Sequence, residues 1–139
     1  GAVYPKGFIS PRGGDYMIHK IDHMVITTAN LPACIAFYKA LGFRAKETGG
    51  RWELFSGDFK INVHMKGHEL EPKAQNVQTG SADFCFEIDD DLVLYRNHLM
   101  AQEITVELGI VVRHGVRGEM QSIYLRDPDG NLIELCSYE

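Results

Sequence analysis

The sequence predicts an α+β protein in which two β-α-β-β-β modules pair into a half-open, eight-stranded barrel. Three observations lead to this prediction. An amphipathic helix with clear start and stop signals follows the first strand, short strands separated by turn residues come next, and the same order then recurs. Each module alone would leave one sheet face uncovered, and pairing the two modules covers it.

The domain is expected to begin after a short N-terminal segment. Residues 1–16 contain two prolines and four glycines without a periodic apolar pattern. We therefore expect a flexible N-terminal arm, or a remnant added for expression, before a single domain of residues 17–139. Its two modules are predicted over residues 17–66 and 80–139.

The first module opens with a strand and a helix. The stretch His19–Thr28 is rich in β-branched residues, and Asn30 then offers a helix N-cap with Pro32 in the first turn. Gly42 is the expected stop signal. Four apolar residues fall on one face of this helix: Leu31, Ile35, Tyr38 and Leu41.

Three short strands complete the first module. They are expected over residues 43–47, 51–55 and 59–64. The residues between them, Gly49–Gly50 and Ser56–Gly57–Asp58, are typical of hairpin turns.

The second module repeats this order. A strand is expected in the segment ADFCFEI, and Asp90 or Asp91 can cap a helix that carries Leu92, Tyr95 and Leu99. A return strand begins over residues 104–108, and a long glycine-containing loop follows. The segments QSIYLR and LIELC are then two strands joined by the turn sequence DPDGN, in which proline presets φ and glycine accepts a positive φ.

The composition narrows the classes of partner. Hydrophobic residues make up 45% of the chain, charged residues 24%, and the formal net charge is -5, so no broad basic surface for nucleic acid is expected. No apolar run approaches the roughly 20 residues that cross a bilayer, and no signal peptide is apparent. We expect a cytoplasmic protein whose three cysteines, Cys34, Cys85 and Cys136, stay reduced.

Three segments resemble a known family. IDHMVITTANLPACIAFYKALGF, GSADFCFEIDD and SIYLRDPDGNLIEL are similar to the opening strand and helix, the fifth strand and the closing hairpin of vicinal oxygen chelate proteins. This superfamily includes glyoxalases, bleomycin and fosfomycin resistance proteins and extradiol dioxygenases. The stretch KINVHMKGHELEPKA resembles more narrowly the glyoxalase domain-containing protein five group and a virulence-associated, lactoylglutathione-lyase-like bacterial group. The resemblance implies the glyoxalase-like form of the predicted fold.

The resemblance also implies a divalent metal site with ligands on the first, fourth, fifth and eighth strands. His23 matches the first-strand histidine and Glu134 the final-strand glutamate. Where the family usually has a fifth-strand histidine this chain has Asp83, and the fourth strand offers Asn62 and, on the same face, His64. We therefore expect His23, His64, Asp83 and Glu134 to bind Ni²⁺, Zn²⁺, Fe²⁺, Co²⁺ or Mn²⁺.

Other residues are candidates for contact with the substrate. Tyr124 shares a strand face with Ser122 and is able to direct its hydroxyl at a bound molecule, although a buried, hydrogen-bonded tyrosine is the commoner case. Arg113 and Arg117 lie in a glycine-containing basic segment that is expected to close over an anionic group. Such a segment is also compatible with an ordinary solvated loop.

The expected activity is that of a glyoxalase-like lyase or isomerase. Its substrate would chelate the metal through two neighbouring oxygens, a glutathione adduct being one candidate, and Glu134 or Asp83 would act as the general base. An extradiol-type, ring-cleaving dioxygenase and a metal-free module that sequesters small molecules are the alternatives. A homodimer is expected, because the family commonly pairs modules between chains.

Overall fold

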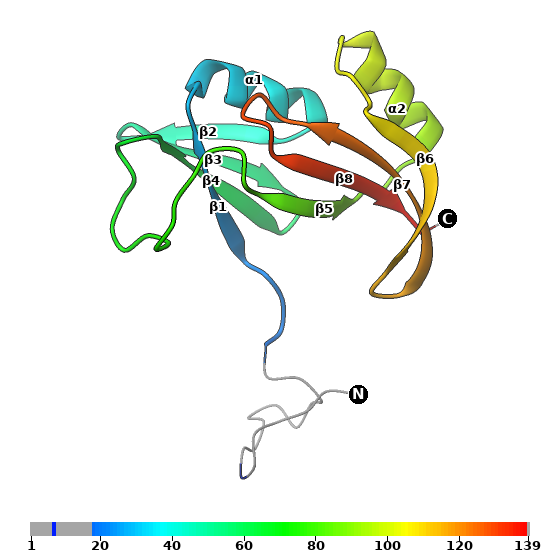
Figure 1. Ribbon diagram of the computed structural model, residues 1–139, viewed down its shortest axis with the longest axis horizontal. Coiled ribbons are helices and arrows are strands. Elements are labelled where there is room, and N and C mark those ends of the chain that lie inside the picture. The colour runs from blue at the N-terminus through cyan, green and yellow to red at the C-terminus, as the bar shows by residue number, and fades with distance from the viewer. Residues whose placement is uncertain (1–6, 8–17, 139) are drawn as a thin grey trace.

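A computed structural model describes Gly7 and residues 18–138 of the chain. The order of its elements is β-α-β-β-β followed by β-α-β-β-β, which confirms the predicted repeat (Figure 1). Apart from Gly7, the predicted N-terminal arm lies outside the described residues.

The first module contains one helix and four strands. They are β1 (His23–Thr28), α1 (Leu31–Leu41), β2 (Arg44–Thr48), β3 (Arg51–Ser56) and β4 (Phe59–Met65).

The second module repeats this arrangement. Its elements are β5 (Asp83–Glu87), α2 (Leu92–Ala101), β6 (Leu108–Gly115), β7 (Gly118–Arg126) and β8 (Leu132–Ser137).

The helix termini follow the predicted signals. The Asn30 side chain accepts a hydrogen bond from the Ala33 amide, and Gly42 ends α1 in the left-handed region with φ of 113°. Asp91, one of the two predicted caps, accepts from the Leu94 amide at the start of α2. These local signals fix where both helices begin.

The strands form two open, four-stranded sheets. The first sheet has the order β1-β4-β3-β2 and the second has the order β5-β8-β7-β6. In each sheet the first and last strands of the module run parallel, and the other pairs run antiparallel. Neither sheet closes into a barrel, in agreement with the half-open architecture that the sequence predicts.

Both helices lie on one side of the sheets, where they cover a shared hydrophobic core (Figure 1). The rings of Phe43 and Phe59 in the first module contact Phe86 in the second, with centroids 5.5 and 5.3 Å apart. The largest fully buried apolar side chains come from both modules: Leu54, Ile61, Leu99, Ile123, Leu125 and Ile133. The two modules therefore bury a single core.

A buried polar contact also joins the modules. The Tyr38 hydroxyl in α1 donates a 2.7 Å hydrogen bond to the Asp127 carboxylate in the β7–β8 turn. The same carboxylate accepts from the backbone amides of Asp129 and Asn131 and from the Asn131 side chain. Burial, followed by the nearby Asp127 charge, raises the pKa of Tyr38, so the hydroxyl stays protonated and remains a donor.

The segment VVRHGVRGEM differs from its prediction. We expected a glycine-containing loop, but β6 and β7 form a hairpin through this segment, and it extends away from the helices (Figure 1). Pairing between β6 and β7 holds the hairpin together. The hydrophobic residues of this segment follow no regular alternation, so the local sequence does not predict that pairing.

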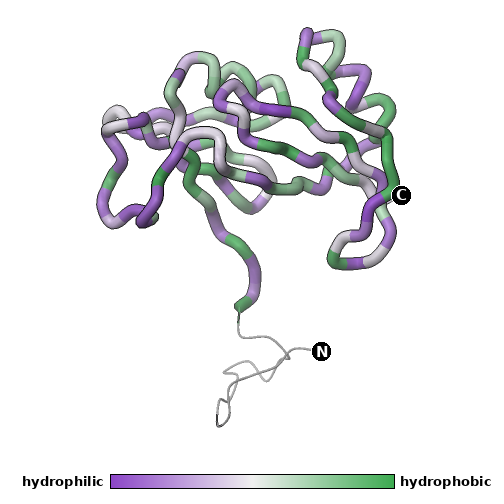
Figure 2. The backbone as a smooth tube through the Cα atoms, viewed as in Figure 1, coloured by the Kyte–Doolittle hydropathy of each residue, from purple (hydrophilic) through white to green (hydrophobic). Residues whose placement is uncertain are grey.

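The connection between β4 and β5 is mostly hydrophilic along its length (Figure 2). Among the described residues, no helix is long and apolar enough to span a membrane.

Candidate active site

The side of each sheet opposite the helices carries the candidate residues. Alternate residues of a strand point to opposite faces, so the neighbours of core residues point away from the helices. On this helix-free face, the first sheet presents His23, Val25, Thr27, Glu53, Lys60, Asn62 and His64. The second sheet presents Asp83, Cys85, Ser122, Tyr124, Glu134 and Cys136.

His23 at the start of β1 is oriented by the residue before it. Its Nδ1 lies 2.8 Å from an Asp22 carboxylate oxygen. The hydrogen bond to His23 lowers the pKa of Asp22, so the carboxylate is ionised and accepts the Nδ1 proton. When Nδ1 carries the proton of a neutral ring, Nε2 has the lone pair that a metal requires.

The register of β1 and β4 separates the two predicted histidine ligands. His23 lies opposite Lys60, whereas His64 lies opposite Thr27. Four residues at about 3.3 Å each place the two histidines roughly 13 Å apart along the sheet. The first sheet of one chain therefore does not bring His23 and His64 to a common ion.

Asn62 lies between these positions on β4, opposite Val25 and on the same face as His23. Its side-chain oxygen is buried and accepts no hydrogen bond from any residue that the structure describes. A buried acceptor without a partner is costly, so this oxygen is suited to receive a ligand donor or a cation.

A basin of about 410 Å³ lies over the first sheet beside these residues. Asn62 and His64 contribute to its wall, together with Lys60 and Glu53, whose Nζ and Oε2 atoms are 2.6 Å apart. The hydrogen bond from Lys60 is the main cause of the lowered pKa of Glu53, and the charges of Lys60, Lys46 and Arg51 add to it. Because Glu53 remains charged, it neutralises Lys60.

Glu134 on β8 is held through one of its two oxygens. The hydroxyl of Ser122, which is completely buried, donates a 2.6 Å hydrogen bond to Glu134 Oε2. The neighbouring Cys85 thiol, a weak donor, also hydrogen-bonds this carboxylate, and a metal or a proton would replace that contact. The antiparallel pairing of β7 with β8 creates this contact between the two strands.

Two thiols lie beside Glu134. Cys85 pairs directly with Glu134, and Cys136 lies two residues further along β8. Burial raises the pKa of both thiols, and the Glu134 charge contributes in the same direction. Both side chains are therefore neutral near pH 7, and neither has the character of a reactive thiolate.

Tyr124 and Arg113, two of the predicted substrate contacts, lie next to each other in the structure. Arg113 Nε donates a 3.0 Å hydrogen bond to the Tyr124 hydroxyl, and its guanidinium lies 5.4 Å from the centre of that ring. Tyr124 pairs directly with Glu134 across β7 and β8. Because the Tyr124 oxygen accepts from Arg113, its own proton remains free for donation.

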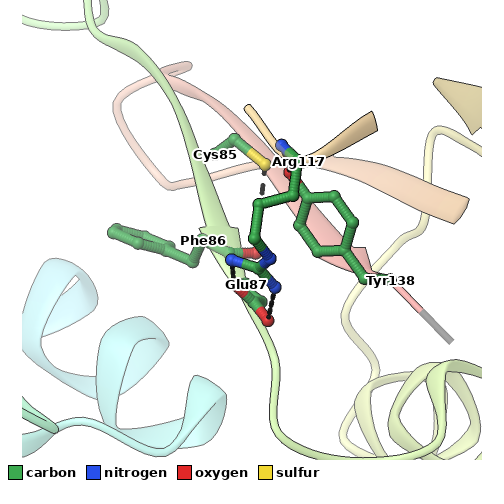
Figure 3. Close-up of polar contacts among 5 residues, drawn as sticks. All are labelled: Cys85, Phe86, Glu87, Arg117 and Tyr138. Atoms are coloured by element: carbon green, nitrogen blue, oxygen red, sulfur yellow. Dashed lines mark hydrogen bonds and ion pairs between the residues drawn. The ribbon is translucent and has the colours of Figure 1, made fainter. Parts of the chain in front are cut away.

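Arg117, the third predicted substrate contact, is engaged elsewhere. It donates two hydrogen bonds of 3.1 and 2.8 Å to the Glu87 carboxylate, and its guanidinium lies 4.1 Å from the ring centre of Tyr138 (Figure 3). The hydrogen bond to Glu87 raises the pKa of Arg117. The expected closure of Arg117 over an anion would first have to break these contacts, which fasten the hairpin to β5.

Asp83 lies at the exposed start of β5, diagonally across from Glu134 on the same face. Its charge adds to the raised pKa of Arg126, whose main cause is the hydrogen bond to Glu107. Within the described part of the chain, no group of three or more His, Cys, Asp or Glu side chains is close enough to hold a metal ion. Of the predicted set, His23 belongs to one sheet and Asp83 and Glu134 to the other.

Sequence reasoning missed two residues that orient the candidate ligands. Asp22 directly precedes His23, and a carboxylate beside a ligand histidine is a usable signal. From the sequence, Ser122 is only a neighbour of Tyr124 on the same strand face. Its contact with Glu134 depends on the register of β7 and β8, which no local pattern reveals.

Comparison with known proteins places the chain in a family. Residues 20–135 match the profile described as Glyoxalase/Bleomycin resistance protein/Dioxygenase superfamily. The chain is 46% identical to the glyoxalase domain-containing protein RDO1 of Mycosarcoma maydis, over 88% of this chain and 70% of that protein.

Two bacterial relatives have solved structures. Virulence protein STM3117 of Salmonella typhimurium is 40% identical, with a TM-score of 0.86 over 89% of this chain and all of that one. A protein from the mobile metagenome of V. pseudocholerae is 48% identical, with a TM-score of 0.85 over 89% of this chain and 98% of that one. A lactoylglutathione lyase from Agrobacterium tumefaciens, at 23% identity and a TM-score of 0.65, shares the fold over 86% of this chain and 93% of that one. The chain belongs to the glyoxalase/bleomycin resistance protein/dioxygenase superfamily.

Proposed function

We propose that this protein is a metal-dependent lyase or isomerase of glyoxalase type that works as a cytoplasmic homodimer on a small substrate with two adjacent oxygens. A glutathione adduct is the first substrate to test. The observation that carries the proposal is the Glu134 carboxylate, which Ser122 holds by one oxygen and whose other described partner is the weak thiol donor of Cys85. A base that takes up and returns a proton requires such a fixed yet available oxygen.

The donor groups fit a divalent cation. His23 offers Nε2 because Asp22 fixes its other nitrogen, Glu134 offers Oε1, and Asn62 offers a buried oxygen without a partner among the described residues. Nitrogen and oxygen donors of this kind suit Ni²⁺, Zn²⁺, Fe²⁺, Co²⁺ or Mn²⁺. When bound, the metal would supply Lewis acidity toward two neighbouring substrate oxygens. We propose Asp83 as the fourth ligand and assign His64 to the wall of the basin.

The protein side chains would move the proton. Glu134 Oε1 would remove a proton from a carbon beside a carbonyl and return it to the neighbouring carbon. Ser122 would keep the carboxylate aimed during both transfers. Asp83, diagonal to Glu134, is the alternative proton carrier. Tyr124, whose oxygen accepts from Arg113, would donate a hydrogen bond to a substrate oxygen and keep its proton. Arg117 would contribute only if it left Glu87.

A second copy of the chain would complete the site. His23 and Asn62 belong to the first sheet, whereas Asp83 and Glu134 belong to the second. Val25 lies in the middle of the edge strand β1, two residues after His23, and is 49% exposed. An apolar residue at this position suits contact with a partner sheet. We propose that the first sheet of one protomer faces the second sheet of its partner.

The two alternative functions are less well supported. An extradiol-type dioxygenase requires two histidines and one carboxylate on one ion, and the register separates His23 from His64. A sequestering module requires an apolar, aromatic cavity, whereas the helix-free faces carry Glu53, Lys60 and Glu134.

Metal analysis of untagged protein, purified without chelators, tests this proposal. We expect nearly one transition-metal ion per chain and a dimeric mass by light scattering. His23→Ala and Glu134→Gln should each abolish tight binding and leave the circular dichroism spectrum unchanged, because neither side chain belongs to the core. Conversion of the methylglyoxal–glutathione hemithioacetal to a thioester is the first activity to measure.

His64→Ala is the matched control. It removes an imidazole from the same face, and it should leave the metal content near that of the wild type. Unchanged metal content in both the His23 and Glu134 variants would show that the site lies elsewhere. A monomeric mass at micromolar concentration would contradict the shared site.

A further inference from the structure

We propose that the basin over the first sheet binds the carboxylate group of a small organic acid, with Lys46 and Arg51 as its anion-binding residues. The inference deepens the proposed function and rests on it for the place where the substrate enters. The substrate is taken to enter through the basin, because the basin shares Asn62 with the proposed metal site.

The wall of the basin has a surplus of positive charge. Lys46, Arg51 and Lys60 contribute three cations. Among the lining residues that the structure describes, Glu53 is the single carboxylate. With histidines neutral, three cations and one acid leave a local charge of +2, although the whole chain has a formal charge of -5. Such a local reversal of sign concentrates anions near the surface.

Two of these cations have no carboxylate of their own. Lys60 donates to Glu53 at 2.6 Å. Lys46 also lies opposite Glu53 across β2 and β3, but neither Lys46 nor Arg51 makes a hydrogen bond or ion pair with any described residue. Their charges act on Glu53 only at longer range. A carboxylate that entered the basin would therefore meet two available donors.

Part of the remaining wall is apolar, which favours an organic acid over an inorganic anion. Met65 and Leu70 line the basin and are 42% and 43% exposed. An aliphatic chain attached to the carboxylate would cover these surfaces and remove them from water. With the carboxylate at Lys46 and Arg51, the rest of the molecule would lie toward Asn62 and His64.

Trp52 is the single tryptophan of the chain and lies in β3 between Arg51 and Glu53 of the basin wall, so its fluorescence is the signal to follow. We would titrate the metal-free protein with hexanoate and with hexanamide, which differ by one charge, at constant ionic strength. Hexanoate should produce a saturable change and hexanamide a much weaker one. Arg51→Gln and Lys46→Gln should each raise the dissociation constant for hexanoate, by about tenfold for the loss of one charge-assisted hydrogen bond.

Lys39→Gln, on the exposed surface of α1, removes the same charge far from the basin and should leave hexanoate binding unchanged. Equal binding of hexanamide would overturn the proposal, and so would unchanged affinity in both basin variants. Displacement of hexanoate by equimolar inorganic phosphate would show an unspecific anion site and would also overturn it. Because this titration uses no metal, its failure is distinguishable from failure of the metal analysis.

Discussion

The two sheets share a topology but differ in the chemistry of their helix-free faces. The first presents His23 Nε2, the Asn62 oxygen and a basin with surplus positive charge. The second presents groups that its own neighbours already hold, namely Glu134 by Ser122 and Tyr124 by Arg113. One face therefore offers unsatisfied groups to a ligand, and the other keeps a carboxylate and a hydroxyl in fixed positions.

A repeated module therefore need not repeat its function. The repeat specifies strand order and a shared core, whereas single side chains on the opposite face decide the chemistry.

Asp127→Ala should lower the free energy of unfolding more than any other change considered, because this carboxylate joins the two modules. Its loss leaves the Tyr38 hydroxyl and the backbone amides of the turn without an acceptor, at a cost of about 3 kcal/mol. Denaturant unfolding can be followed by the fluorescence of Trp52, which lies in the first sheet, and by circular dichroism of the whole chain. The midpoints of the two transitions should shift together.

Tyr38→Phe is the matched control for that experiment. It removes one hydrogen bond but keeps the Asn131 contacts of Asp127, so it should cost about 1 kcal/mol. If the Trp52 transition stayed in place in Asp127→Ala, the sheets would be separate folding units.

Ser122→Ala should have an intermediate effect, confined to the second sheet. Without its hydrogen bond, Glu134 would lose its fixed orientation, and affinity for a metal should fall about tenfold, as it does when residues that orient metal ligands are removed. A Co²⁺ titration followed by visible absorption measures this affinity. Ser81→Ala, which removes an exposed hydroxyl from the turn before β5, should have no effect. Equal affinities of Ser122→Ala and the wild type would refute the role of Ser122.

Arg117→Gln should have the smallest effect, because the pair with Glu87 is exposed to solvent. The hydrogen bond to Arg117 lowers the pKa of Glu87. The pair therefore contributes its full stability above the ordinary pKa of glutamate and loses it as pH falls through the lowered value. Thermal unfolding of the variant should differ slightly from the wild type at neutral pH and low salt. A difference that persisted in acid or in high salt would contradict this account.

The fold was predictable from local signals. The caps at Asn30 and Asp91, the stop at Gly42 and the glycine-rich turns act within a few residues, so the chain itself reveals them. The hairpin over residues 108–126 was missed at its first strand, because that strand is defined by pairing with β7 and carries glycines and charges in an irregular order.

The candidate site was predictable only in part. The strand positions of His23 and Glu134 follow from sequence, and both lie on helix-free faces. The distance between His23 and His64 depends on the register between β1 and β4, which are separated by a helix and two strands. Contacts such as Asp127 with Tyr38, or Glu87 with Arg117, likewise appear only when distant segments meet.

The alternation along the strands has a consequence for how this surface can change. Asn62 lies between the buried Ile61 and Val63, and Glu134 lies between the buried Ile133 and Leu135. Replacement of either polar residue alters the chemistry without disturbing the packing. Deletion of one residue would exchange the two faces of the strand from that point on, placing charge in the core and hydrocarbon on the surface. New specificities on this scaffold should therefore arise by substitution within strands, and changes of length should be confined to the turns.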